Sequence, residues 1–303
     1  MSHLLSQLWL AQASEAGAVG ATADSIVSWL LGNGGALFSL INTIILVLTA
    51  IVEQLLNAPA PWLFALVVAL LGLWRVSAAF SLLSLLGLNL VQAMGLWEPM
   101  VSSLALVLTA SLLALAIGLP LGVLAARQRS IWQLTRPLLD LMQTMPAFVY
   151  LIPAVMLFST GAVPSVIATL IFSMPPVVRL TVLGIRQVPA DLIEAGRSFG
   201  CSEWQLLTKV QLPNALPTLM TGVNQTIMLA LSMVVIASMI GAGGLGNEVL
   251  RGIQRLDIGL GFEGGLGVVF LAIILDRITQ SIGGGRQKSG FAQLRRAFRR
   301  NDT

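Results

Sequence analysis

Charged residues are scarce in this chain of 303 residues: Asp, Glu, Lys and Arg make up 10% of it, whereas 56% of its residues are hydrophobic. Soluble domains carry about 25% charged residues, so the composition excludes a water-soluble globular protein. The apolar residues form blocks of helix length, which favours helices over the alternating strands of a β-barrel. The sequence therefore predicts an all-α integral membrane protein.

Cysteine and histidine are almost absent, because each occurs once, as Cys201 and His3. A lone cysteine excludes a disulfide within the chain, and these two residues are too few for a zinc cluster. The sequence also offers no carboxylate pair and no Ser/His/Asp set for catalysis. We therefore predict no catalytic residue, no metal site and no cofactor in this chain, and no enzymatic activity of its own.

Lysine and arginine are absent from residues 1–74, and six of the 17 lie in residues 286–300. The net charge of +4 is therefore not spread along a groove, and we predict no nucleic-acid partner. Two interpretations of the basic tail, residues 286–303, stay open. It forms an amphipathic helix on anionic membrane lipid, or it is a solvated tail that follows the positive-inside rule.

The apolar blocks predict about seven transmembrane helices, since about 20 apolar residues cross a hydrocarbon core of roughly 30 Å. The expected spans are residues 62–79, 80–97, 100–126, 142–160, 163–183, 219–242 and 264–283. With seven spans, most Lys/Arg clusters fall on one side, and Arg251 and Arg255 are the exceptions. The positive-inside rule then predicts an N-terminus outside and a C-terminus in the cytoplasm.

Residues 36–56 are apolar enough to span, but Asn42, Thr43, Glu53 and Gln54 interrupt them. An eighth span here would move the N-terminus inside. We instead expect an interfacial helix on the outer face. The predicted organisation is an extracytoplasmic tail with this helix in residues 1–60, a transmembrane domain in residues 61–285, and the basic tail.

One polar segment, residues 184–218, interrupts the apolar blocks on the side that carries most of the positive charge. Asp191 is placed to cap a short helix, with Glu194 three residues later as in a capping box. Gly200 permits a turn with positive φ, a second helix is expected over residues 202–210, and Pro213 is expected to end it. The pattern indicates a rigid cytoplasmic knob for docking, or merely a well-capped loop.

The spacing of this loop resembles the "EAA" loop of ABC importer permeases, with a glycine at position 196 where a second alanine is usual. Further similar runs are Ile117-Gly-Leu-Pro-Leu-Gly122, Pro146-Ala-Phe-Val-Tyr-Leu151, Gln187-Val-Pro-Ala-Asp-Leu-Ile-Glu194, Val223-Asn-Gln-Thr226 and Ile274-Leu-Asp-Arg277. Over about residues 60–283 the chain resembles the permease subunits of glycine betaine/proline ABC importers, the ProW/OpuA type.

This resemblance implies a type I importer permease in the bacterial inner membrane. The implied partners are a second copy of the chain, two ATPase subunits that bind ATP and Mg, a periplasmic or tethered substrate-binding protein, and membrane lipid. The residues implied to couple to the ATPase are Glu194, Ala195, Gly196, Gly200, Leu212 and Pro213. No phosphate-binding loop of an ATPase occurs in the chain itself, and Gly241–Gly246, which matches a dinucleotide-binding spacing, follows an apolar helix and not a strand.

A quaternary ammonium substrate favours aromatic faces, and polar residues inside spans mark transport paths. The candidates for the translocation path are Phe148, Tyr150, Phe172, Asn224, Gln225 and Ser232. Packing between helices is the alternative role for each. The expected function is ATP-driven import of glycine betaine or a related quaternary ammonium or proline-like osmolyte, for osmoprotection. Choline and trimethylamine N-oxide stay open as substrates, and a stand-alone secondary transporter is the alternative from another class.

Overall fold

The computed structural model describes residues 18–283, and the basic tail predicted for residues 286–303 lies outside them. Every regular element in the described part is helical. In chain order the elements are α2 Ala18–Asn57, α3 Pro61–Arg75, α4 Ala78–Ala93, α5 Trp97–Arg127, α6 Arg129–Thr144, α7 Ala147–Phe158, α8 Ala162–Arg186, α9 Ala190–Ser198, α10 Glu203–Gln205, the π-helical turn η1 Leu206–Gln211, α11 Leu212–Ala237, the 3₁₀ turn η2 Ser238–Ile240, α12 Gly244–Arg255 and α13 Ile258–Gly283. The all-α prediction is confirmed.

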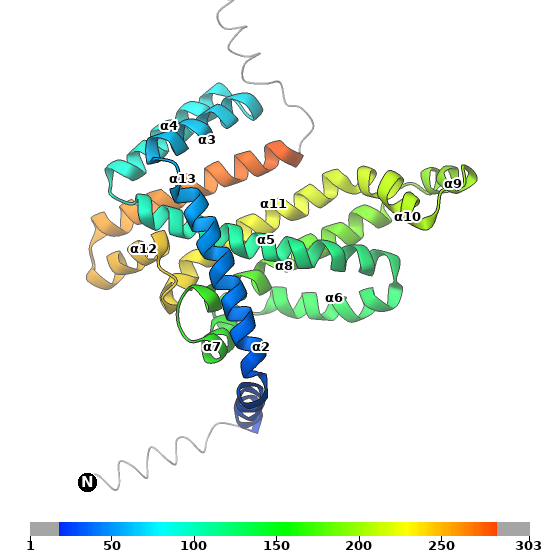
Figure 1. Ribbon diagram of the computed structural model, residues 1–303, viewed down its shortest axis with the longest axis horizontal. Helices are drawn as coiled ribbons and strands as arrows, with labels where there is room; N and C mark the ends of the chain where they lie inside the picture. The colour runs from blue at the N-terminus through cyan, green and yellow to red at the C-terminus, as the bar shows by residue number, and fades with distance from the viewer. Residues whose placement is uncertain (1–17, 284–303) are drawn as a thin grey trace, which may run out of the picture.

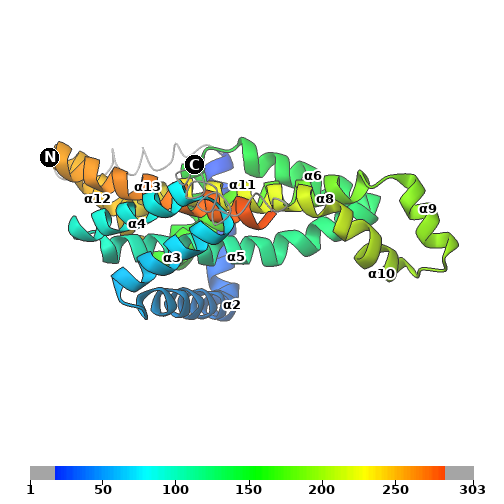
Figure 2. The same ribbon diagram turned by 90° about the horizontal axis from the view of Figure 1, so that it is seen from above.

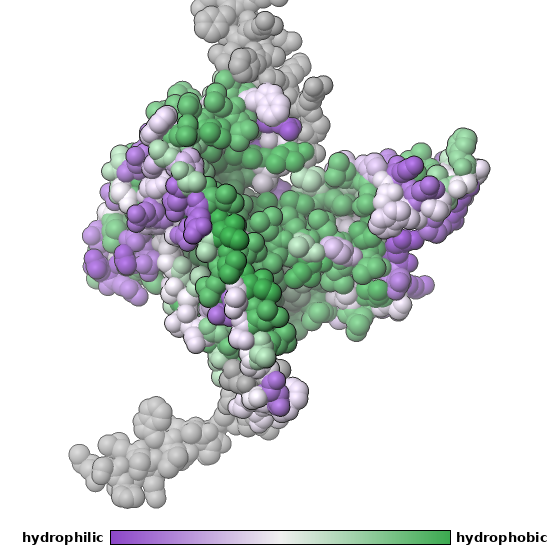
Figure 3. Space-filling model, in the orientation of Figure 1, coloured by the Kyte–Doolittle hydropathy of each residue, from purple (hydrophilic) through white to green (hydrophobic). Residues whose placement is uncertain are grey.

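Three long helices, α5, α8 and α11, run side by side and form the centre of the bundle (Figure 1). The short helices α9 and α10 project from one end, and α12 lies at the opposite end, as the second view confirms (Figure 2). Hydrophobic side chains cover the middle of the visible face, and polar side chains gather at the two ends (Figure 3). This is the distribution of a protein whose long helices cross a bilayer.

Glycines allow the three central helices to approach closely. A Cβ added at Gly118 of α5 would lie 2.5 Å from the side chain of Val177 of α8, and one added at Gly122 would lie 2.6 Å from that of Thr181. One added at Gly222 of α11 would lie 3.2 Å from the Cα of Val177. Small residues four apart are what close packing of membrane helices requires, since lipid supplies no hydrophobic force between them.

The span count differs from the predicted seven. In the described residues five helices are long and apolar enough to cross a membrane, or six if the bent pair α6–α7 forms one span. Expected spans 62–79 and 80–97 are α3 and α4, of 15 and 16 residues, so each is only about 23 to 24 Å long. The chain turns between them at Ser77, whose hydroxyl accepts a hydrogen bond from Phe80 N at 3.2 Å.

The expected span 142–160 is also not one straight helix, because α6 and α7 meet at an angle of 102°. Met145, between them, has extended backbone angles, φ −73° and ψ 136°. Pro146 follows it, and a proline disfavours the helical conformation in the residue before it. Pro146 marks this break in the sequence, but the expected span began four residues before it, at residue 142.

Helix α2 contains the whole segment 36–56, and its part Gly32–Asn57 is long and apolar enough to cross a membrane. It crosses the central helices at a steep angle (Figure 1) and packs against α5. Glu53, one of the polar interruptions noted in the sequence, accepts a hydrogen bond from the Ser102 hydroxyl of α5 at 2.7 Å. This contact gives the carboxylate a partner within an apolar setting.

Helices α12 and α13 also meet at glycines, which gives a stability prediction. A Cβ on Gly252 would lie 2.5 Å from the backbone N and Cα of Gly261, and backbone atoms cannot rotate away. We expect Gly252→Ala to destabilise the chain by about 1–3 kcal/mol, the cost of overpacking. Thermal unfolding of the purified variant and wild type in detergent measures this loss of stability.

Gly265→Ala is the matched control, because a Cβ there meets nothing within 4 Å. Alanine also favours helix over glycine by up to about 1 kcal/mol, so this variant should unfold at the same temperature or higher. Equal melting temperatures for both alanine variants would contradict the proposed close approach.

Candidate functional site

The loop between α8 and α11 begins with α9, which ends in a glycine motif. Gly200 has φ +77°. The N–H of Gly200 donates to the carbonyl of Arg197 at 2.9 Å, and the N–H of Cys201 donates to that of Gly196 at 3.1 Å. This bond pair is a Schellman motif, which satisfies the last carbonyls of the helix. The left-handed turn predicted at Gly200 is confirmed.

The predicted capping of this loop is wrong in its position. The residue that precedes α9 is Pro189, and no side chain caps that helix, so Asp191 lies inside its first turn. The capping box belongs to α10 instead. Ser202 accepts from Gln205 N at 3.3 Å, and the Gln205 side chain accepts from Ser202 N at 2.9 Å. Asp191 still lies where the helix dipole favours a carboxylate.

The prediction that Pro213 ends the second helix is wrong. Pro213 lies in the first turn of α11, directly after η1, and the helical path continues from Glu203 to Ile240. A proline inside a regular α-helix removes a hydrogen bond, and here the π-helical turn η1 directly precedes the turn that contains Pro213. A π-helical turn next to a functional loop is common, and here it joins the loop to a membrane-spanning helix.

The loop is anchored by apolar contacts with the bundle. Gly196 of α9 is buried, and a Cβ there would lie 2.7 Å from the Leu206 side chain. Leu207, which is 1% exposed, packs with Ile185 of α8 and with the partly buried Leu212. Gly196, which departs from the usual alanine, therefore lets α9 lie directly on η1.

Glu203 connects the loop to the end of α5. Its carboxylate lies 3.5 Å from the Arg127 guanidinium and 3.4 Å from that of Arg197. All three side chains are at least one-third exposed, so each pair stabilises the loop by at most about 1 kcal/mol. The pairs orient α10 more than they stabilise it.

The outer surface of the loop is apolar as well as polar. Phe199 is 89% exposed and Trp204 is 68% exposed, while Glu194 and Ala195 are also exposed on α9. The loop projects beyond the long helices (Figure 1). Large exposed aromatic side chains on a projecting loop are typical of a protein interface. The sequence prediction missed both aromatic residues, although two large aromatic residues in a polar segment were a visible signal.

The six candidates for the translocation path lie in three different environments. Tyr150 is buried and donates to the carbonyl of Met142 at 2.6 Å, with its ring 6.3 Å from that of Phe172. Phe148 is 53% exposed on α7. The other three candidates are on α11.

Asn224 binds side chains of α13: its amide donates to Asp276 at 3.2 Å, and its carbonyl accepts from the Thr279 hydroxyl at 2.6 Å. Gln225 and Ser232 are exposed, and their spacing of seven residues places them on one face of α11. The structure thus groups Tyr150 with Phe172, and Gln225 with Ser232, and gives Asn224 a role in joining two helices.

Comparison with known proteins adds to this geometry. The profile of the family described as "Binding-protein-dependent transport system inner membrane component" matches residues 118–283. The glycine betaine/proline betaine transport system permease protein ProW of Escherichia coli (strain K12) is 56% identical over 245 residues, which cover 80% of this chain and 69% of that protein. The glycine betaine transport system permease protein OpuAB of Bacillus subtilis (strain 168) is 47% identical over 260 residues, 86% of this chain and 92% of that protein.

The chain belongs to this family. As one of its inner membrane components, it is a multi-pass permease subunit of an ABC transporter and is not itself an enzyme. ATP is bound by a separate ATPase subunit, and the transport system includes a substrate-binding protein.

A solved permease fold agrees with this assignment. A chain of the MetNI methionine ABC transporter in an inward-facing conformation superposes with a TM-score of 0.56 at 21% identity. The match covers 60% of this chain and 91% of that chain. The predicted fold, that of an ABC importer permease, is confirmed.

Proposed function

We propose that this permease carries glycine betaine and proline betaine across the inner membrane, driven by ATP hydrolysis in its partner ATPase. The observation that supports the proposal most strongly is the 56% identity, over most of the chain, to a permease with those substrates. Osmoprotection is the expected physiological role.

The loop that includes α9 and α10 would couple the permease to the ATPase. Gly200 and Gly196 keep the loop compact, Leu212 anchors it, Pro213 starts the helix that receives the motion, and Glu194 and Ala195 lie on its exposed surface. A loop that is closely packed inside transmits a displacement without deforming. ATP-driven closure of two ATPase subunits would therefore move α11 through this loop.

A second copy of the chain would complete the path. The apolar windows of α2 and α13 are only 11% and 22% buried within one chain, against 61% for α8, so much apolar surface is free to meet a partner or lipid. Gln225 and Ser232 would face the path or the second copy, with Phe148, Tyr150 and Phe172 near it and Asn224 holding α11 to α13. The loop end would be cytoplasmic, with the N-terminus outside, residues 1–60 on the outer side and residues 61–285 forming the permease core.

Uptake by the whole transporter in proteoliposomes tests the proposal. The chain is reconstituted with its ATPase and binding protein, and labelled glycine betaine, choline and trimethylamine N-oxide are compared. We expect uptake of glycine betaine that requires ATP and the ATPase. Uptake by the permease alone, driven by an ion gradient, would instead indicate a secondary transporter. Preference for choline or trimethylamine N-oxide would still indicate an ATP-driven importer, but one with a different substrate.

A further inference from the structure

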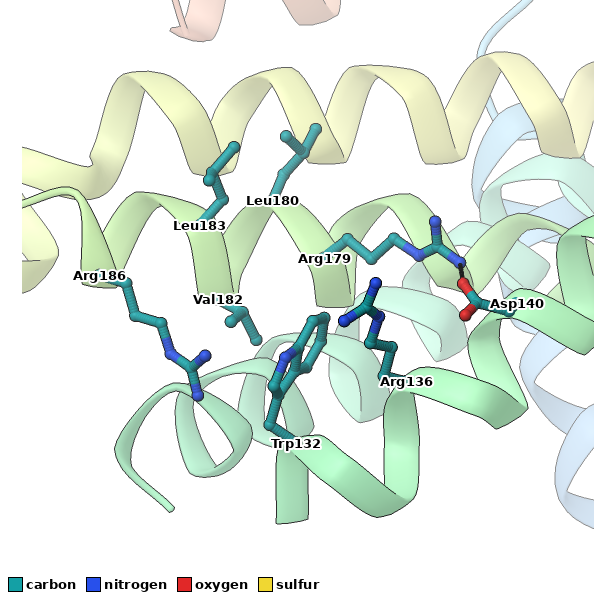
Figure 4. Close-up of a pocket in the computed structure, with 8 residues that line it drawn as sticks. All are labelled: Trp132, Arg136, Asp140, Arg179, Leu180, Val182, Leu183 and Arg186. Atoms are coloured by element: carbon teal, nitrogen blue, oxygen red, sulfur yellow. Dashed lines mark hydrogen bonds and ion pairs between the residues drawn. The ribbon is translucent and has the colours of Figure 1, made fainter. Parts of the chain in front are cut away.

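A cavity of about 390 Å³ lies between α6 and α8, at the end of the bundle that carries the loop (Figure 4). Four charged residues line it: the arginines Arg136, Arg179 and Arg186, and the carboxylate Asp140. Trp132 stands between Arg136 and Arg186, and Val182 of α8 points toward it (Figure 4). Leu180 and Leu183 also line the cavity, and in this view they point away from Trp132. None of these residues lies in α9 or α10 or is a candidate for the path, although Arg186, the last residue of α8, falls within the polar segment 184–218.

The arginines have unequal partners. Arg179 forms an ion pair with Asp140, but its Nε is buried without a hydrogen-bond partner. Arg186 donates to the carbonyl oxygens of Ala125 and Ala126, at 2.8 and 3.3 Å, and lies 5.5 Å from the Trp132 ring. Arg136 has no ion pair and no hydrogen bond to another described residue. The cavity therefore contains three guanidinium groups and one carboxylate, and the excess of positive charge favours an anion.

The depth of the cavity matches the headgroup layer of a membrane. Arg186 is the last residue of α8, and Arg179 lies seven residues before it, about 10 Å along the helix axis. Arg136 lies seven residues after the start of α6, again about 10 Å inside the helix end. Tryptophan is enriched at this level of a bilayer. Leu183 is 43% exposed, so apolar surface continues from the cavity to the outside of the bundle.

We propose that this cavity binds the phosphate headgroup of an anionic phospholipid. Arg136 and Arg186 would bind the phosphate, since guanidinium groups match phosphate oxygens in charge and geometry. An acyl chain would lie along Leu180 and Leu183. Basic pockets between membrane helices on the cytoplasmic side are suited to anionic headgroups.

The transported betaine fits this cavity less well. Its quaternary ammonium would meet an excess of positive charge, and the one aromatic face in the cavity, that of Trp132, already faces the Arg186 guanidinium. Asp140, the one carboxylate, is occupied by Arg179. A lipid phosphate brings negative charge and an apolar chain together, which corresponds to both parts of the lining.

Lipid retention by the purified full-length chain tests the proposal. The protein in detergent is incubated with phosphatidylglycerol and phosphatidylcholine in equal amounts, and bound lipids are counted by native mass spectrometry. We expect the wild type to retain phosphatidylglycerol preferentially. Arg136→Gln should reduce that retention about fivefold, as expected for the loss of about 1 kcal/mol per basic residue. Arg136→Lys should retain most of it.

Arg129→Gln is the matched control, because Arg129 is an exposed arginine of the same helix that does not line the cavity. The proposal is overturned if Arg136→Gln retains as much phosphatidylglycerol as the wild type, or if Arg129→Gln loses as much. It is also overturned if inorganic phosphate or glycine betaine displaces the lipid, since the cavity would then hold a soluble ligand. Uptake is not measured, so failure here leaves the proposed transport function untouched.

Discussion

Gly200→Val should reduce substrate uptake by about tenfold or more and leave membrane insertion unchanged. Gly200 has φ +77° in the Schellman motif that ends α9. The left-handed conformation costs a residue with a Cβ about 1–2 kcal/mol, and β-branched residues tolerate this conformation least. About 1.4 kcal/mol corresponds to a factor of ten in an equilibrium. The α9–α10 turn would then leave its native geometry, and ATP hydrolysis would no longer be coupled to uptake.

The expected effect comes from backbone strain and not from a steric clash, because a Cβ at Gly200 meets nothing within 4 Å. Gly200→Asn is the control, because asparagine adopts positive φ more readily than other residues with a Cβ and should retain most uptake. Measured in proteoliposomes, ATPase activity and uptake should separate in the valine variant only. Normal uptake with valine would contradict a role for the turn in coupling.

Replacing Phe199 and Trp204 together with alanine should weaken ATPase binding by at least about 30-fold. Their exposed fractions are 89% and 68%, so both are free to enter a partner surface. Aromatic residues at the centre of an interface each contribute about 2 kcal/mol or more when truncated, and even one such loss is about 30-fold in affinity. Titration of the purified ATPase against the permease in nanodiscs measures the change.

Phe262→Ala is the matched control for this pair. Phe262 is also a highly exposed aromatic residue, at 69%, but it lies in α13 close to α12 in sequence, at the opposite end of the bundle. This variant should bind the ATPase as tightly as the wild type. If both variants bind alike, the loop aromatic residues do not form the docking surface.

The sequence predicted the parts of this protein that depend on one residue or one local pattern. Gly200 was correctly placed in a left-handed turn, because glycine adopts that conformation at no steric cost. The spans 100–126, 163–183, 219–242 and 264–283 correspond to α5, α8, α11 and α13, since long apolar runs leave few alternatives to a membrane helix.

Other features depend on competition between neighbours. Asp191 and Ser202 both had the chemistry of a cap, and the box formed at Ser202, where Gln205 supplies the reciprocal bond. Pro213 was interpreted as a helix end, but it lies in a first turn, because η1 precedes it. Local composition does not distinguish these outcomes.

The arginine cavity was beyond sequence reasoning for a different reason. Arg136 and Arg179 are on separate helices, and they face one cavity only because α6 folds back along α8 (Figure 1). The break that redirects the chain is at Gln128, an extended residue between α5 and α6, and no local pattern at Arg136 or Arg179 shows that the two helices then pack together. Contacts across such a break follow from the tertiary fold.

Crosslinking from the loop tests the central claim, that α9 and α10 dock on the ATPase. Cys201 is the one cysteine of the chain, so Cys201→Ser leaves a background in which Phe199→Cys carries a single thiol. In the assembled transporter, a bifunctional reagent at this position should join the permease to the ATPase subunit, and Phe262→Cys should not. Crosslinking of Phe199→Cys to the substrate-binding protein, or of Phe262→Cys to the ATPase, would contradict the account.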